Sequence, residues 1–119
     1  ANPSSMRTAV ALLCDVTPSG RKAAIVGDMK ELGRYASVKH RQLGTWLARA
    51  AVDVIIAVGE YAPLVAQGAR ARGVPARRIV IAADAGEALV AAHARIRKGD
   101  TVLLKGSRLV ELEKVFEQW

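Results

Sequence analysis

The sequence has little cysteine, few aromatic residues and no long apolar run, and each shortage excludes a class of protein. A single cysteine, Cys14, excludes a disulfide within the chain and is typical of a reducing compartment. No apolar run approaches the roughly 18–20 residues that cross a bilayer, and no basic-then-apolar signal segment opens the chain, so we expect no membrane insertion. Aromatic residues make up 4% of the chain, which leaves few rings to stack on nucleic-acid bases.

The motifs of several well-known sites are absent as well. The sequence contains no G-x-x-x-x-G-K-[ST] phosphate-binding loop, no G-x-G-x-x-G dinucleotide fingerprint and no G-x-S-x-G nucleophile elbow. His40 and His93 have no cysteine or carboxylate partners at metal-ligand spacing, so we expect no metal site. Cys14 falls on a predicted amphipathic helix, where we expect a small buried residue rather than a nucleophile.

The chain does have a large apolar fraction and a basic balance. Its 119 residues, of which 51% are hydrophobic, suffice for one domain with a core. The net charge of +7 fits a nucleic-acid binder, a domain that meets anionic small molecules, or a solvated arginine-rich surface. The spread of the basic residues along the chain favours the solvated surface. They include Arg21, Lys22, Arg70, Arg72, Arg77, Arg78, Arg95, Arg97 and Lys98.

Short apolar runs alternate with helical patterns along the chain. The runs occupy residues 23–26, 54–58, 79–82 and 102–104. Each is nearly continuous, which is typical of strands covered on both faces. Apolar stripes at helical spacing lie before, between and after the runs; Asn2 and Asp84 are candidate N-caps, and the last stripe covers residues 112–119. This alternation predicts an α/β fold, a Rossmann-like three-layer sandwich with a mainly parallel sheet.

The turns after the four runs are expected to share one rim, because ligands of open α/β sheets bind outside the carboxyl ends of the strands. Residues 105–108, Lys-Gly-Ser-Arg, follow the last run and fit either an anion site at a helix start or a turn with a helix cap. Residues 27–33 place Asp28 and Glu31 between two glycines, which fits either an ammonium or hydroxyl site or a loop with solvated charges. Residues 1–6 fit a helix cap.

In their order, these segments resemble a known family. The motifs are Ala-Asn-Pro-Ser-Ser-Met at residues 1–6, Gly-Asp-Met-x-Glu-Leu-Gly at residues 27–33, His40 with Gly44, Val58-Gly59, Gly99-Asp100 and Lys-Gly-Ser-Arg at residues 105–108. Together they resemble the C-terminal domain of a Mur ligase over essentially the whole chain. The resemblance implies one domain, residues 1–119, with amine-substrate and nucleotide-closing contacts. Because the chain starts inside a motif, we expect the N-terminal and central ATPase domains to be absent from it.

The resemblance also implies an activity for the complete enzyme. Mur ligases use ATP to convert a carboxylate into an acyl phosphate, which an incoming amine attacks. The Gly-Asp-Met-x-Glu-Leu-Gly segment favours the member that adds D-alanyl-D-alanine to UDP-N-acetylmuramoyl-tripeptide in the bacterial cytoplasm, for peptidoglycan synthesis. ATP and Mg²⁺ are bound mainly by the central domain, so we expect the isolated chain to be inactive. The alternatives are another amide ligase of the superfamily, such as a glutamate-adding enzyme, and a non-enzymatic basic nucleotide- or nucleic-acid-binding module.

Carried onto this chain, the resemblance assigns substrate binding to the rim and implies neither a catalytic residue nor a metal ligand here. The substrate-binding residues are Asp28, Glu31, Glu60, Lys105, Gly106, Ser107 and Arg108. The first two would face the dipeptide, and Glu60 is a weaker candidate for the amine-substrate pocket. The cations and the serine of residues 105–108 would face the dipeptide carboxylate or the transferring phosphoryl group. Asn2 would lie at a hinge near the nucleotide, whereas His40 is expected to be structural.

Overall fold

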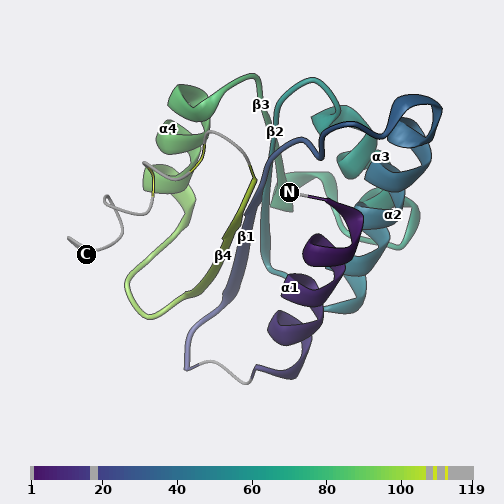
Figure 1. The fold of residues 1–119 in the computed structure, drawn as a ribbon. Helices are drawn as coiled ribbons and strands as arrows, with labels where there is room; N and C mark the ends of the chain where they lie inside the picture. Colours follow the sequence, from purple (N-terminus) through teal and green to yellow (C-terminus); the bar gives the residue numbers. More distant parts are fainter. Residues whose placement is uncertain (1, 17–18, 107–108, 110–111, 113–119) are drawn as a thin grey trace.

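One parallel sheet of four strands organises the chain in this computed structural model (Figure 1). The structure describes residues 2–16, 19–106, 109 and 112. The strands are β1 (Lys22–Val26), β2 (Val54–Val58), β3 (Ile79–Ala82) and β4 (Thr101–Lys105). Their order across the sheet is β3-β2-β1-β4, and every neighbouring pair is parallel. The four predicted runs are therefore strands, and the first and last extend slightly beyond the predicted ends.

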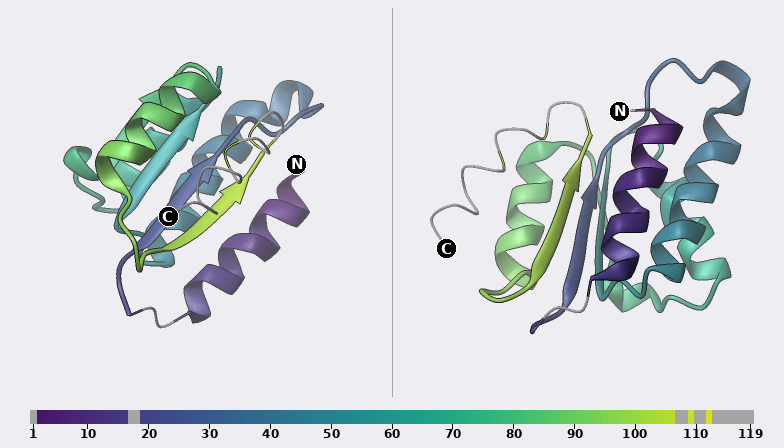
Figure 2. Two further views of the ribbon diagram at one scale, coloured as in Figure 1. Left: turned by 90° about the vertical axis from the view of Figure 1, so that its left-hand side faces the viewer. Right: turned by 60° about the horizontal axis from the view of Figure 1, so that its bottom comes forward.

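Helices cover both faces of the sheet, as the sequence predicts (Figure 2). The helices are α1 (Pro3–Asp15), α2 (Ala36–Arg49), α3 (Ala62–Ala71) and α4 (Ala85–Arg95), with short 3₁₀ turns η1 (Gly33–Tyr35) and η2 (Ala76–Arg78). The first three pack on one face, and α4 packs on the other. The three-layer α/β sandwich is thus confirmed. Of the last predicted helix, Leu112 is described and is buried; the remainder lies outside the described residues.

Two separate cores explain why the strands read as continuous apolar runs. Alternate side chains of a strand point to opposite faces, so Ala24 and Val26 join the core under α1–α3 while Ala23 and Ile25 join the core under α4. All five residues of β1 and of β2 are buried. Both cores are built from this chain's own side chains, and we therefore expect the chain to fold by itself.

Three residues lie in environments other than those expected. Ile81 on edge strand β3 is 52% exposed, so this strand is not covered on both faces. Cys14 is exposed rather than buried, because it falls outside the apolar stripe of α1. Lys22 is only 9% exposed rather than solvated. Its ammonium donates hydrogen bonds to the carbonyls of Cys14 and Ala50, at the C-terminal ends of α1 and α2, where backbone oxygens lack helical partners.

Candidate functional site

The carboxyl ends of β1, β2 and β3 surround a cavity of about 420 Å³. The loop after β2 leads to α3 on one face of the sheet, whereas the loop after β3 leads to α4 on the other, so a crevice opens between them. Its lining residues are Gly27, Asp28, Lys30, Val58, Gly59, Glu60, Ala83, Asp84, Ala85, Gly86 and Leu109. The turns after β1, β2 and β3 share this rim as predicted, and Asp28 and Glu60 lie together there although 31 residues separate them in the sequence.

The carboxylate of Asp28 connects two strand ends. Its Oδ2 accepts a hydrogen bond from the backbone amide of Glu60 at 2.9 Å, and its Oδ1 accepts one from the amide of Tyr61 at 3.0 Å. These amides precede the first turn of α3, where backbone donors lack helical partners and a carboxylate is favourable. Gly59, at φ 112°, lets the carboxylate approach, since a Cβ there would lie 2.5 Å from Oδ2. Asp28 therefore fixes the rim in addition to lining it.

The loop that follows Asp28 is anchored by His40. The Nε2 of this buried ring accepts a hydrogen bond from the amide of Met29 at 3.0 Å, and its Nδ1 lies 2.7 Å from the carbonyl oxygen of Ala36. An amide can only donate and a carbonyl can only accept, so the proton of the neutral ring belongs on Nδ1. The ring also stacks on Tyr61, with centroids 4.5 Å apart. These contacts support the structural role expected for His40.

Glu31 lies on the exposed outer part of the same loop. Its φ is 59°, in the left-handed region that few non-glycine residues adopt. It lines a smaller hollow of about 260 Å³ that also includes Asp28, Glu60 and Tyr61. Asp28 and Glu60 line both hollows, so the three predicted carboxylates lie along one rim.

The end of β4 lies beside that of β1. The amide of Gly27 donates to the carbonyl of Lys105 at 2.9 Å, and Gly106, at φ 144°, packs so closely that a Cβ would lie 2.7 Å from the nitrogen of Gly27. Strand alternation puts the Lys105 side chain on the α1–α3 face with Leu103, away from the cavity. Ser107 and Arg108 lie outside the described residues, so the anion site predicted for this segment stays a prediction.

Asn2 begins α1 with a reciprocal capping box. Its side-chain oxygen accepts from the amide of Ser5 at 2.9 Å, and the hydroxyl of Ser5 accepts from the amide of Asn2. The local interpretation as a helix cap is confirmed. The nucleotide contact implied by the family resemblance remains a prediction for this residue.

Charges of both signs line the crevice, which determines what it can hold. Asp28, Glu60 and Asp84 contribute carboxylates to the lining, and Lys30 contributes an ammonium group. The methyl groups of Ala83 and Ala85 line the same crevice. The Asp84 carboxylate caps α4 by accepting a hydrogen bond from the amide of Glu87.

Within the described ranges, no group of three or more His, Cys, Asp or Glu side chains could hold a metal ion. No helix in these ranges is both long and apolar enough to span a bilayer.

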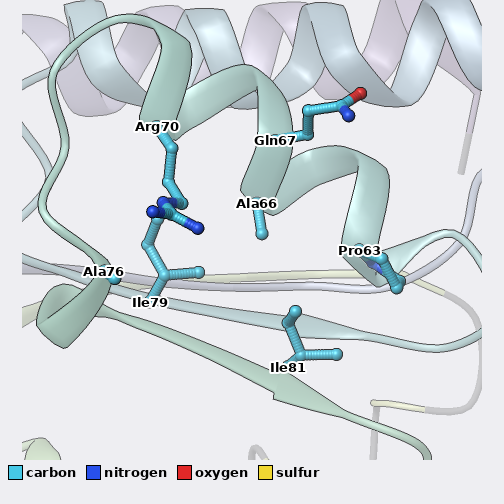
Figure 3. Close-up of a pocket in the computed structure, with 7 residues that line it drawn as sticks. All are labelled: Pro63, Ala66, Gln67, Arg70, Ala76, Ile79 and Ile81. Carbon is cyan, nitrogen blue, oxygen red and sulfur yellow. The ribbon is translucent and has the colours of Figure 1, made fainter.

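A second cavity, of about 540 Å³, lies between α3 and edge strand β3 (Figure 3). Its described lining residues are Pro63, Ala66, Gln67, Arg70, Ala76, Ile79 and Ile81. This lining is largely aliphatic, and Arg70 is its charged member. Side chains of both charges line the crevice, whereas this cavity has only one charged lining residue among those described. The crevice is therefore the better candidate for a polar, charged substrate.

The fold and the crevice define an α/β sandwich domain whose candidate ligand site lies at the carboxyl ends of parallel strands. The family model for the Mur ligase, glutamate ligase domain, matches residues 1–108, and the chain belongs to that family.

Among curated proteins, the chain is 29% identical over 115 residues to the UDP-N-acetylmuramoyl-tripeptide–D-alanyl-D-alanine ligase of Bacillus subtilis, with 97% of this chain and 25% of that protein covered. The same ligase of Mycobacterium leprae is 32% identical, with 94% of this chain and 24% of that protein covered. This chain thus spans about a quarter of the length of these relatives.

Solved structures show the same similarity in three dimensions. A MurF structure from Acinetobacter baumannii superposes with a TM-score of 0.74 at 29% identity, and covers 99% of this chain and 26% of that one. MurF from Thermotoga maritima, solved in complex with ADP, superposes with a TM-score of 0.67 at 30% identity, and covers 98% of this chain and 25% of that one. The architecture is therefore shared with a domain-sized part of each of these ligases.

Proposed function

We propose that this chain is the C-terminal domain of an ATP-dependent ligase that adds D-alanyl-D-alanine to UDP-N-acetylmuramoyl-tripeptide in bacterial, cytoplasmic peptidoglycan synthesis. The observation that carries the proposal is the convergence of Asp28, Lys30 and Glu60 in one crevice, in a chain whose relatives bear that ligase's name. The rest of the ligase, with its N-terminal and central domains, would be the partner that the crevice faces.

The chemistry of the crevice suits the proposed amine substrate. D-alanyl-D-alanine is a zwitterion with small methyl side chains, so it needs an anionic partner for its ammonium group and a cationic partner for its carboxylate. The free carboxylate of Glu60 is exposed in the crevice, and Lys30 supplies a cation close to it. Both oxygens of Asp28 already accept backbone amides, so its main contribution is to hold Glu60 in place.

ATP and Mg²⁺ fit this chain poorly as resident groups. The sequence has no phosphate-binding loop, and the described residues contain no cluster of metal-ligating side chains. The proposal therefore assigns the metal and most nucleotide contacts to the rest of the ligase. We assign the binding of the amine substrate to this domain. Asn2 and Lys105 would contact the nucleotide and the transferring group when the domain closes on the rest of the ligase.

The test is a ligation assay with the complete ligase that contains this chain. We expect it to join D-alanyl-D-alanine to UDP-N-acetylmuramoyl-tripeptide and to use D-glutamate at least about a hundredfold less well, because a site that pairs both charges of one substrate rejects amines that leave a charge unpaired. Efficient use of another amino acid would instead identify another amide ligase of the superfamily. Absence of any ATP-dependent ligation would contradict the proposal.

Two controls make the assay specific to this domain. The 119-residue chain alone is expected to give no product and no ATP hydrolysis, because charge stabilisation of the transferring group comes from the rest of the ligase. In the complete enzyme, Glu60→Gln is expected to raise the KM for D-alanyl-D-alanine, while Asp15→Asn, at the exposed C-terminal end of α1 and outside the crevice, leaves it unchanged. Equal effects of the two substitutions would remove Glu60 from the site.

A further inference from the structure

Arginines gather at the end of the sheet opposite to the crevice. A cavity of about 350 Å³ at this end is lined by Arg21, Asp53, Val54, Arg77, Arg78, Ala94, Arg95 and Arg97. The five arginines come from three segments: one precedes β1, two lie in η2 before β3, and two lie around the turn between α4 and β4. The spread of basic residues along the sequence therefore becomes a local concentration of positive charge in the fold.

Two of these arginines hold the cluster together. The guanidinium of Arg21 donates to the carbonyl of Arg95 and to the carboxylate of Asp100, and the guanidinium of Arg95 donates to the carbonyl of Arg77 at 2.6 Å. The backbone segments that carry the cluster are thus tied to one another by their own side chains.

The guanidinium groups of the other three arginines are not used to hold the backbone. The side chains of Arg77, Arg78 and Arg97 are exposed and make no hydrogen bond or ion pair with any described residue. The carboxylate of Asp53, which also lines the cavity, accepts from the amide of Lys22 at 2.9 Å. The cavity therefore presents an excess of positive charge, with planar donor groups that match phosphate oxygens.

We propose that this arginine cluster, residues 21, 77, 78, 95 and 97, binds the diphosphate group of a small soluble ligand. The cavity is large enough for two linked phosphates, and the free guanidinium groups of Arg77, Arg78 and Arg97, which approach it from two segments, can contact oxygens of both. Few aromatic side chains are available to stack bases, which favours a small phosphate ligand over a nucleic acid. The site lies at the amino ends of the strands, so it is separate from the crevice assigned to the amine substrate.

Calorimetric titration of pyrophosphate into the 119-residue chain tests this site. The Arg77→Gln/Arg97→Gln variant is expected to bind pyrophosphate at least about tenfold more weakly than the wild type, because each lost charge-assisted contact is worth roughly that factor. The matched control is Arg7→Gln/Arg34→Gln, which removes the same charge from exposed positions in α1 and η1, outside the cluster. It is expected to change the affinity by less than about twofold, since salt screens distant charges.

Several results would overturn the proposal. Wild-type binding no tighter than that of the Arg77→Gln/Arg97→Gln variant would do so, as would an equal loss in the control pair, which would indicate a general effect of net charge. Binding to phosphatidylglycerol vesicles but not to pyrophosphate would show a membrane surface as the partner instead. The titration is repeated with the complete ligase, and loss of binding there would mean that the cluster is covered in the parent protein and is not a ligand site.

Discussion

The Nε2 of His40 accepts a hydrogen bond from the backbone amide of Met29 at 3.0 Å, and this contact links helix α2 to the loop that leaves β1. The same ring stacks on Tyr61, whose own amide donates to Asp28. One buried imidazole thus contacts two of the three segments that build the crevice. The rim that carries the candidate substrate residues is therefore held by interactions that reach into the core.

Removal of the imidazole acceptor should destabilise the chain even when the ring shape is kept. His40→Phe preserves an aromatic ring against Tyr61 but leaves the buried amide of Met29 without a partner, so we expect a loss of about 1–3 kcal/mol in the free energy of unfolding. His40→Ala adds a cavity and should cost roughly 3–5 kcal/mol. Urea denaturation measures both, with the exposed Val38→Ala of the same helix as the control. Full stability of His40→Phe would show that the Met29 contact contributes nothing.

Two carboxylates of the crevice should respond differently to the loss of charge. Asp28→Asn replaces one acceptor by an amide donor that faces a backbone N–H, so we expect the free energy of unfolding to fall by about 1.5–3 kcal/mol. Glu60→Gln removes the same charge from an exposed side chain and should change stability by less than about 0.5 kcal/mol. Thermal denaturation of the two variants side by side makes the comparison. Equal stabilities would mean that the Asp28 hydrogen bonds are not structural.

The contact between Gly106 and Gly27 should make residue 106 intolerant of any side chain. Gly106→Ala adds a Cβ 2.7 Å from a backbone nitrogen, an overlap that no side-chain rotation can relieve. Gly73→Ala is the control, because Gly73 also has a positive φ but nothing within 4 Å of the added Cβ. We expect the control to lose about 1 kcal/mol from backbone strain and Gly106→Ala to lose a further 1–3 kcal/mol or so. Similar losses, measured by urea denaturation, would argue against the close packing.

Much of the fold could be predicted because local patterns and tertiary packing agree in the centre of the sheet. The runs at β1 and β2 are covered on both faces, so their continuous apolar pattern matches their environment. The cap at Asp84 needs only its own helix, and it forms as expected. The pattern is least informative at the sheet edge, where Ile81 is half exposed although its sequence run resembles the others.

The position of the candidate site could be predicted from the sequence, but the hydrogen bonds that hold it could not. The rule that ligands bind at strand carboxyl ends brings Asp28 and Glu60 to one rim. No local pattern shows that Asp28 accepts the amides of the next strand turn, or that His40 holds Met29, because both contacts depend on how separate segments pack. The arginine cluster was hidden for the same reason, since its members lie far apart in the sequence.

The carboxylate of Asp100 should give the chain a pH-dependent share of its stability. Burial alone would raise the pKa of this carboxyl, but hydrogen bonds from the amides of Arg97 and Arg21 and from the Arg21 guanidinium outweigh it and lower the pKa below the ordinary 3.8. Because the folded pKa lies below the unfolded one, the carboxylate stabilises the fold at higher pH, and this contribution is lost as the pH falls through the folded pKa.

Asp100→Asn should therefore be less stable than the wild type at neutral pH, by about 1–3 kcal/mol from weakened charge-assisted hydrogen bonds. The difference should shrink as the pH falls from about 4 toward 2. Unfolding free energies measured across this range give the comparison, with the exposed Asp15→Asn measured alongside as the matched loss of one carboxylate. A difference that stays constant with pH would contradict the assigned hydrogen bonds.

Lys105 provides the sharpest test of the rim in the complete ligase. It ends β4 beside Val26, is partly buried, and makes no hydrogen bond or ion pair with the described residues, so its ammonium group is available to an anion. The proposed contact of Lys105 with the transferring phosphoryl group would contribute one charge-assisted hydrogen bond of roughly 1.5–3 kcal/mol. Lys105→Met keeps the apolar stem and should lower kcat/KM by roughly 10- to 150-fold with the fold intact.

The control for Lys105 is Lys98→Met, which removes the same charge at the opposite end of the sheet, in the turn before β4. It should leave kcat/KM for D-alanyl-D-alanine and for ATP unchanged. Arg108→Met, at a position outside the described residues, extends the test to the other cation of the segment. Melting temperatures are measured for each variant, because a folding defect would lower activity for a different reason. Wild-type kcat/KM in both Lys105→Met and Arg108→Met would leave the segment as a turn, with Lys30 as the cation that the crevice offers to a substrate.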